Sequence, residues 1–209
     1  MQGEAGRAAR NMPVSPSGEQ VDAQREGPLL QRPSYACNLC PMEPLIGRML
    51  VKMMTRDQIL AHLRTADAVA RDAVAHGHHP FGAVLVGPDD RILMRQGNID
   101  TVRHAETELA RRAATAYPPE FLWTCTLVST GEPCAMCTGT LYWANIGRLV
   151  YGFEETKLLE LTGDHPKNPT INLSSRTVLG SGQKKIEVHG PFPELEEELL
   201  AQHRDFWKR

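Results

Sequence analysis

Two short motifs in this chain carry residue types that bind metal ions and move protons. His104-Ala105-Glu106 begins one stretch typical of a helix, and Pro133-Cys134-Ala135-Met136-Cys137 begins another. Each motif is weak alone, because a lone Cys-x-x-Cys is often a redox pair or an accident. Their spacing is more informative. The 30 residues from His104 to Cys134 accommodate one helix, one strand and their turns, which brings two helix N-termini to the same end of a parallel sheet.

One imidazole and two thiolates are a donor set that a catalytic zinc ion uses, with the fourth position left for water. We therefore predict that His104, Cys134 and Cys137 bind one Zn²⁺ per subunit. Cys134 and Cys137 share the first turn of a helix, whose positive end favours the thiolate form. Two thiolates offset the charge of the metal, so a nearby base is required. Glu106 is the predicted catalytic acid and base.

Alternating helix and strand patterns position these motifs. A capping box at Thr55 and Gln58 opens an amphipathic helix that we expect to end before Gly77. Strands over 82–87 and 91–95 flank a Pro-Asp-Asp turn and should pair antiparallel. The remaining predicted elements are a helix over 104–116, a strand over 124–129, a helix over 135–145, a strand over 148–151, a helix near 155–161, a strand near 185–189 and an acidic helix from 193 onward. This order predicts an α/β fold of three layers, α/β/α, around a mixed five-stranded sheet.

The first quarter of the chain differs from the rest. Residues 1–52 hold six prolines and five glycines, and all eight histidines follow residue 61. We therefore predict a disordered or upstream extension over 1–52, a native start near Met53 and Met54, and a zinc-dependent domain over 53–209. Cys37 and Cys40 fall in the extension, where a four-cysteine structural zinc site with the later pair is an alternative.

Composition restricts the class of protein. The 23 Lys and Arg residues against 25 Asp and Glu residues lack the basic excess of a nucleic-acid binder. An odd count of five cysteines suits a reducing compartment, and no apolar run approaches the length of a membrane span. We expect a soluble cytoplasmic protein that does not bind membranes. Cys125 is expected to be a core residue, and Trp143 to pack its helix against the sheet, with lining of the site as the alternative for Trp143.

The two motifs together resemble the signature of zinc-dependent nucleobase deaminases, and residues 55–209 resemble the cytidine deaminase superfamily. His79-Pro-Phe-Gly-Ala-Val-Leu-Val86 is similar to the first strand of the branch that contains tRNA adenosine deaminases and guanine deaminases. Glu132 to Ala144 also resembles this branch, and its Tyr142-Trp143-Ala144 is most similar to guanine deaminases. The resemblance implies a cytidine deaminase-like fold and hydrolytic deamination by a zinc-activated water, with release of ammonia.

The resemblance also implies substrate-binding residues. Backbone N–H groups near Ala105 and Cys134 would hold the base, and Asn98 stands where the family has an Asn that contacts the base or sugar. Only five residues separate Asn98 from His104, a shorter loop than in relatives. Asp164 matches part of a guanine-recognition stretch, although a turn role is an alternative for it. Phe206 and Trp207 resemble aromatic residues that close the pocket in relatives, sometimes from a neighbouring subunit.

Three hypotheses follow for the function. The first is a deaminase of a free nucleobase or nucleoside, with a guanine-like purine favoured and cytosine or pterin-like substrates left open. A free base is preferred to RNA because residues 53–209 carry 17 basic against 20 acidic groups. The second is a tRNA adenosine deaminase. The third is a non-catalytic zinc-stabilised interaction protein, which would have no use for Glu106. Relatives of this kind form homodimers, and 142–145 and the C-terminal helix are the expected interface.

Overall fold

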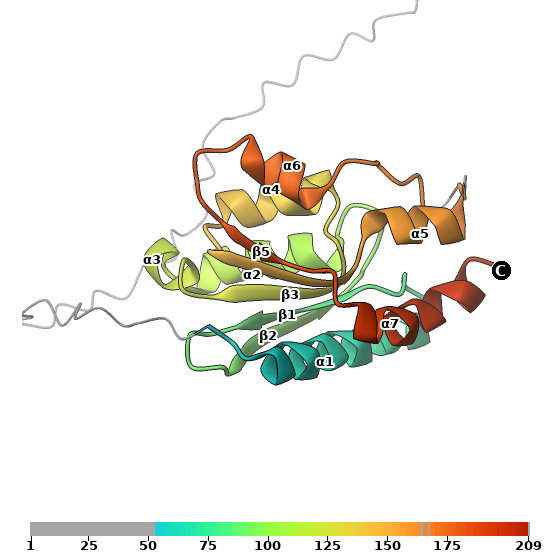
Figure 1. Ribbon diagram of the computed structural model, residues 1–209, viewed down its shortest axis with the longest axis horizontal. Helices are drawn as coiled ribbons and strands as arrows, with labels where there is room; N and C mark the ends of the chain where they lie inside the picture. Colours follow the sequence, from blue (N-terminus) through green and yellow to red (C-terminus); the bar gives the residue numbers. More distant parts are fainter. Residues whose placement is uncertain (1–52, 164, 167, 209) are drawn as a thin grey trace, which may run out of the picture. The chain divides into compact units, whose positions relative to one another are not determined.

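The computed structural model describes residues 53–163, 165–166 and 168–208. Helices and strands alternate through most of them (Figure 1). In chain order the elements are α1 (Arg56–Ala75), β1 (Gly82–Val86), β2 (Ile92–Gly97), α2 (Ala105–Ala116), α3 (Pro119–Leu122), β3 (Thr126–Gly131), α4 (Ala135–Trp143), β4 (Arg148–Phe153), α5 (Glu155–Thr162), α6 (Ser175–Gly180), β5 (Glu187–His189) and α7 (Pro193–Phe206).

The five strands form one mixed sheet in the order β2-β1-β3-β4-β5. The β1–β2 hairpin is antiparallel, and β1 also pairs antiparallel with β3. The pairs β3–β4 and β4–β5 are parallel. The helix that follows β3 therefore starts at the same sheet edge as the segment that follows β4, which is where α/β sheets collect functional residues.

Local chemistry explains the first helix. Thr55 accepts a hydrogen bond from the backbone N–H of Gln58, and the Gln58 side chain accepts one from the backbone N–H of Thr55. This is the predicted capping box. Gly77 lies beyond the helix end at φ +82°, a conformation that favours glycine.

Apolar side chains cover both faces of the sheet. On one face α2, α4 and α6 enclose a cluster that includes Leu109, Leu141 and Leu179. On the other face α1 and α7 enclose a cluster that includes Leu63 and Leu199. Figure 1 shows these two helical layers on either side of the strands. The alternation of apolar residues along β1, with Ala83 and Leu85 in one cluster and Val84 and Val86 in the other, is what a strand buried on both faces requires.

The predicted three-layer architecture, the five strands and the antiparallel hairpin are confirmed. Two short helices, α3 and α6, were not predicted, because four and six residues are too few for a helical period to show. The predictions for residues 1–52, including the extension and the cysteines there, lie outside the described residues. Among the described helices, none has the length and apolar character that a bilayer crossing demands.

Candidate metal centre and active site

The two motifs meet at one edge of the sheet because each begins a helix there. His104 is the N-cap of α2 and Cys134 is the N-cap of α4. Cys137 lies one turn into α4 and is almost fully buried. A connection of six residues from the end of β2 carries the chain to His104, and a connection of two residues from the end of β3 carries it to Cys134. Both predicted helix starts are therefore brought together as expected.

The donor atoms of these three residues fit a tetrahedral ion. His104 Nδ1 lies 3.7 Å from Cys134 Sγ and 3.5 Å from Cys137 Sγ. The two sulfur atoms are 3.6 Å apart. A tetrahedral zinc with Zn–S of about 2.3 Å and Zn–N of about 2.0 Å sets its donor atoms about 3.5 to 3.8 Å apart. The spacing of this donor set is therefore that of a zinc site with three protein ligands.

The electrostatics of the site favour a thiolate. The Cys137 thiol, followed by the His104 side chain, holds the pKa of Cys134 well below its usual value, to about 4. The thiolate of Cys134 and burial raise the pKa of Cys137. A hydrogen bond to Cys134 raises the pKa of His104. Cys134 is therefore in the form that binds a metal ion across the neutral pH range.

Glu106 is a buried carboxylate beside the donor atoms. Its side chain is only 4% exposed. Glu106 Oε1 accepts a hydrogen bond of 2.5 Å from the Ser129 hydroxyl, and Oε2 lies 3.3 Å from Cys137 Sγ. Thr107 donates from its hydroxyl to Cys137 Sγ at 3.2 Å. The Ser129 contact fixes the orientation of the Glu106 carboxylate in the first turn of α2, next to the metal-binding atoms.

A cavity of about 310 Å³ opens over the metal-binding residues. It adjoins a smaller hollow of about 30 Å³ that also contains Glu106. A larger hollow of about 390 Å³ lies between α1 and the edge strand β2, but it contains none of the predicted site residues, so volume alone does not identify the site. The described residues that line the cavity are His79, Thr101, His104, Cys134, Met136, Glu155, Pro166, Asn168, Pro169, Thr170 and Ile171.

Glu155 is the acidic residue of this lining, and it was not predicted from the sequence. Burial, followed by the charges of Cys134, Glu106 and Glu132, raises the pKa of Glu155 to about 8. Its position could have been found, since it follows the parallel strand β4 by two residues, at the sheet edge that carries the metal-binding motifs. Asn168 and Thr170 lie in a segment without regular structure, where no periodic signal exists to find them.

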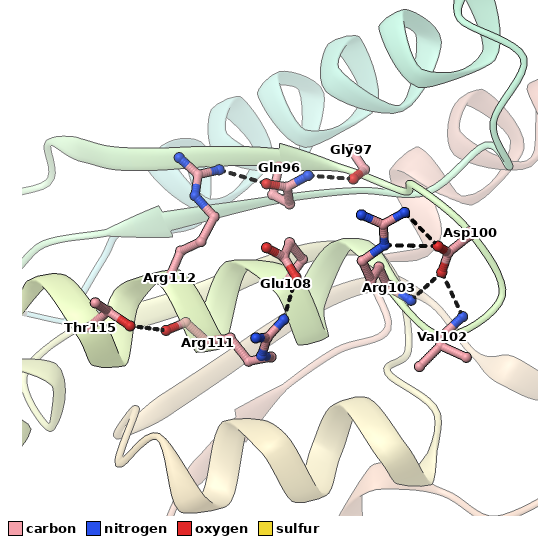
Figure 2. A network of polar contacts seen from close by, with 9 residues as sticks. All are labelled: Gln96, Gly97, Asp100, Val102, Arg103, Glu108, Arg111, Arg112 and Thr115. Carbon is pink, nitrogen blue, oxygen red and sulfur yellow. Dashed lines mark hydrogen bonds and ion pairs between the residues drawn. The ribbon is translucent and has the colours of Figure 1, made fainter. Parts of the chain in front are cut away.

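The loop before His104 is held by one acidic side chain. Asp100 accepts hydrogen bonds from the backbone N–H groups of Val102 and Arg103 and from the Arg103 side chain (Figure 2). These contacts lower the pKa of Asp100 to about 2, with the backbone of Arg103 as the largest cause. They close the short loop and leave Thr101 in the cavity lining.

Asn98 lies at the base of this loop and is 2% exposed. Its side-chain amide donates to the carbonyl of Asp100 at 3.2 Å, while Oδ1 has no partner among the described residues. Asn98 and Ala105, which is fully buried at the first position of α2, are not among the described residues that line the cavity. Their predicted contacts with substrate stay predictions.

The C-terminal aromatic residues contact the cavity lining through His79. Phe206 and Trp207 contact the His79 ring, with ring centroids 5.6 and 5.0 Å away. His79 lines the cavity, whereas neither aromatic residue does so among the described lining residues. Asp164 lies outside the described residues. The structure thus brings His104, Glu106, Cys134 and Cys137 together and sets Phe206 and Trp207 against a residue of the cavity.

Two residues outside the site test the packing predictions. Cys125 is fully buried, as expected. The prediction for Trp143 is wrong, because its side chain is 81% exposed at the end of α4. The helix presents Trp143 outward while Leu141 takes the place against the sheet.

A mixed sheet with a His-Cys-Cys site at two helix starts defines a class of zinc-dependent hydrolases. The family model described as "Cytidine and deoxycytidylate deaminase zinc-binding region" matches residues 56–153. The chain is 36% identical over 152 residues to a Schizosaccharomyces pombe protein named "Probable cytosine deaminase", a match that covers 71% of this chain and 91% of that protein.

Two further matches widen the range of substrates among relatives. The chain is 36% identical over 85 residues to the guanine deaminase of Bacillus subtilis, which covers 39% of this chain and 54% of that protein. A solved structure from a study of A-to-I editing by tRNA:A34 deaminases is 27% identical and superposes with a TM-score of 0.52 over 68% of this chain and 98% of that chain.

This chain belongs to the cytidine and deoxycytidylate deaminase family. It is a hydrolytic deaminase of a nucleobase or nucleoside, with a zinc-binding domain in which His104, Cys134 and Cys137 are placed to hold a metal ion.

Proposed function

We propose that this enzyme deaminates a free nucleobase or nucleoside, with a guanine-like purine as the preferred substrate and Glu106 as the catalytic acid and base. The observation that carries the proposal is the cavity over the metal-binding residues. No Lys or Arg stands among the described residues of its lining. A polynucleotide substrate calls for cationic contacts to phosphate, whereas a neutral base does not.

Zinc held by His104, Cys134 and Cys137 would supply a Lewis acid that makes water nucleophilic at neutral pH. In the net reaction the water oxygen bonds to the ring carbon, the bond from that carbon to the amino group breaks, and ammonia leaves. Glu106 takes a proton from the attacking water on one carboxylate oxygen and delivers it to the substrate. Ser129 holds the other oxygen, Oε1, at 2.5 Å, so Glu106 keeps one orientation through both transfers.

Replacing Glu106 with Gln tests this role. The variant preserves size and keeps an oxygen for the Ser129 hydroxyl, but its amide cannot act as an acid or a base near neutral pH. We expect one zinc per chain and no measurable turnover. Loss of zinc from Glu106→Gln would instead assign the residue to metal binding.

The preference for a guanine-like base rests on the acceptors in the cavity. Guanine presents two neighbouring N–H donors, at the ring nitrogen and the 2-amino group. The carboxyl group of Glu155 and the side-chain oxygen of Asn168 line the same cavity and can accept from such a pair. The match to the guanine deaminase of Bacillus subtilis supports this choice.

Cytosine is the second candidate, because the relative named "Probable cytosine deaminase" is matched over 91% of its length. An ammonia-release screen of the zinc-loaded enzyme against guanine, guanosine, adenine, cytosine, cytidine and aminopterins distinguishes the two. We expect the highest kcat/KM with guanine or guanosine. A higher value with cytosine would replace the guanine assignment. Inosine formation in tRNA without release from any base or nucleoside would overturn the proposal.

We further propose that the enzyme is a homodimer that pairs through α4. This helix contains no charged residue. Its outward side presents Trp143, which is 81% exposed, and Met136, which also lines the cavity. An apolar helix face of this kind is suited to cover by a second copy that presents the same surface, with Lys184, whose Nζ lies 5.7 Å from the centre of the Trp143 ring, at its border.

The mass of the particle in solution tests this pairing. Light scattering on a sizing column should give twice the chain mass for the natural sequence and a shift toward the monomer for Trp143→Arg. Trp123→Arg is the matched control, because Trp123 is exposed outside α4. An unchanged mass for Trp143→Arg would refute the α4 interface.

A further inference from the structure

Glu132 is a buried acidic residue for which the proposed reaction has no use. It follows β3 and stands two residues before the metal ligand Cys134, with only 7% of its surface exposed. Its backbone N–H donates to the carbonyl of Phe153 at 2.8 Å, which ties it to β4. A buried carboxylate requires hydrogen-bond donors, and those of Glu132 come from two separate elements.

The two oxygens of Glu132 bind opposite ends of one segment. Oε1 accepts from the backbone N–H of Ser175 at 2.8 Å and from the Ser175 hydroxyl at 2.7 Å. Oε2 accepts from the backbone N–H of Glu155 at 3.3 Å. Glu155 opens α5 and Ser175 opens α6, so one side chain holds the start of both helices.

The chain between these two anchors forms one wall of the cavity. It includes α5 and then described residues without regular structure, of which Pro166, Asn168, Pro169, Thr170 and Ile171 line the cavity. Figure 1 shows this stretch running from α5 to α6. Hydrogen bonds within it join near neighbours, as from Asn168 to Thr170 and from Leu173 to Ile171, and the His165 ring contacts the Trp207 ring with centroids 5.3 Å apart. We call residues 155–175 the wall segment.

We propose that Glu132 is a positioning residue that fixes the wall segment against the metal-binding end of β3 and thereby sets the width of the substrate cavity. The segment closes a loop whose two ends meet at a single carboxylate. Displacement of either end moves cavity-lining residues relative to Cys134, two residues from Glu132. The expected changes in KM and kcat rest on the proposed function, whereas the role of Glu132 in holding the wall segment does not.

Three variants of the zinc-loaded enzyme test this role. Glu132→Gln has a single acceptor oxygen, so it can serve Ser175 or Glu155 but not both. Ser175→Ala removes the hydroxyl contact and keeps the backbone one. Glu154→Gln is the matched control. Glu154 is the acidic residue directly before Glu155, but its side chain contacts Thr156 at the start of α5. Each variant is measured for zinc content, for hydrogen exchange by mass spectrometry and for KM and kcat.

For Glu132→Gln we expect the bound zinc to be retained. The hydrogen-exchange rate of backbone amides in residues 163–174 should rise by about tenfold or more, because leaving a buried hydrogen-bonding group without a partner changes an equilibrium by about that factor. KM should rise by a similar factor, with a smaller change in kcat. Ser175→Ala should show a smaller rise in the same residues, and Glu154→Gln none. Unchanged exchange in residues 163–174 of both Glu132→Gln and Ser175→Ala would overturn the proposal, as would a uniform rise across the domain in Ser175→Ala.

The exchange measurement does not require activity. If the natural enzyme released no ammonia from any base, the proposed function would fail while the exchange data still decided the role of Glu132. If Glu132→Gln does not fold, Ser175→Ala decides alone.

Discussion

The contact between Ser129 and Glu106 makes a quantitative prediction about catalysis. Ser129 is fully buried on β3, and its hydroxyl donates to a Glu106 carboxylate that is only 4% exposed. Replacing Ser129 with Ala leaves one carboxylate oxygen without its donor in a site that water reaches poorly. Glu106 then loses the contact that fixes its orientation for proton transfer.

The expected magnitude follows from the type of hydrogen bond. A hydrogen bond to a charged group contributes about 1.5 to 3 kcal/mol. Each 1.36 kcal/mol of activation free energy corresponds to a tenfold change in rate. If the contact is needed in the transition state, Ser129→Ala should lower kcat by about 10- to 150-fold. Zinc content and KM should change little, because Ser129 contacts neither the metal-binding atoms nor the described cavity lining.

The assay is steady-state ammonia release with the best base found in the screen, together with metal analysis of each protein. Thr130→Val is the matched control, because Thr130 is the next residue of β3, is 1% exposed and bonds the backbone of Gly82 instead of Glu106. Its kcat should stay within about twofold of the natural value, since successive strand residues point to opposite faces. A Ser129→Ala enzyme with full zinc and unchanged kcat would refute the reasoning.

Three further predictions concern the metal, pH and packing. Cys134→Ser should lower zinc content and activity together and lower the melting temperature, because a bound metal stabilises the folded state; equal zinc in the variant and the natural protein would contradict the site. Burial lowers the pKa of His203 to about 3, so the folded state keeps it neutral while the unfolded state binds a proton below about pH 6.5. This contribution to stability is present above pH 6.5 and is lost as pH falls, by about 2 kcal/mol at pH 5. In denaturant titrations, the free energy of unfolding should therefore differ less between pH 7 and pH 5 for His203→Gln than for the natural protein. Gly82→Ala would place a Cβ 2.2 Å from the carbonyl oxygen of Ala66 in α1 and should destabilise the fold by about 1 to 3 kcal/mol, whereas Gly180→Ala meets no atom within 4 Å and should be neutral in the same unfolding measurement.

Local patterns in the sequence were sufficient for the elements and for the metal ligands. The capping box at Thr55, the turn between β1 and β2, and the helix starts at His104 and Cys134 are all decided by residues within a few positions of each other. The metal site was predictable for the same reason. Its donors occupy the first turns of two helices that β-α-β order brings to one sheet edge, so the chain order alone constrains their meeting.

The cavity was decided by the tertiary structure. Glu155, Asn168 and Thr170 line one cavity with His104 and Cys134 although they follow β4 in the chain, and no periodic pattern in the sequence specifies that arrangement. The outward direction of Trp143 depends in the same way on which side of α4 packs against the sheet. Residue type and spacing therefore determined the chemistry of this protein, whereas its substrate-binding surface depends on long-range packing and on buried contacts such as those of Glu132, which join residues more than 20 positions apart.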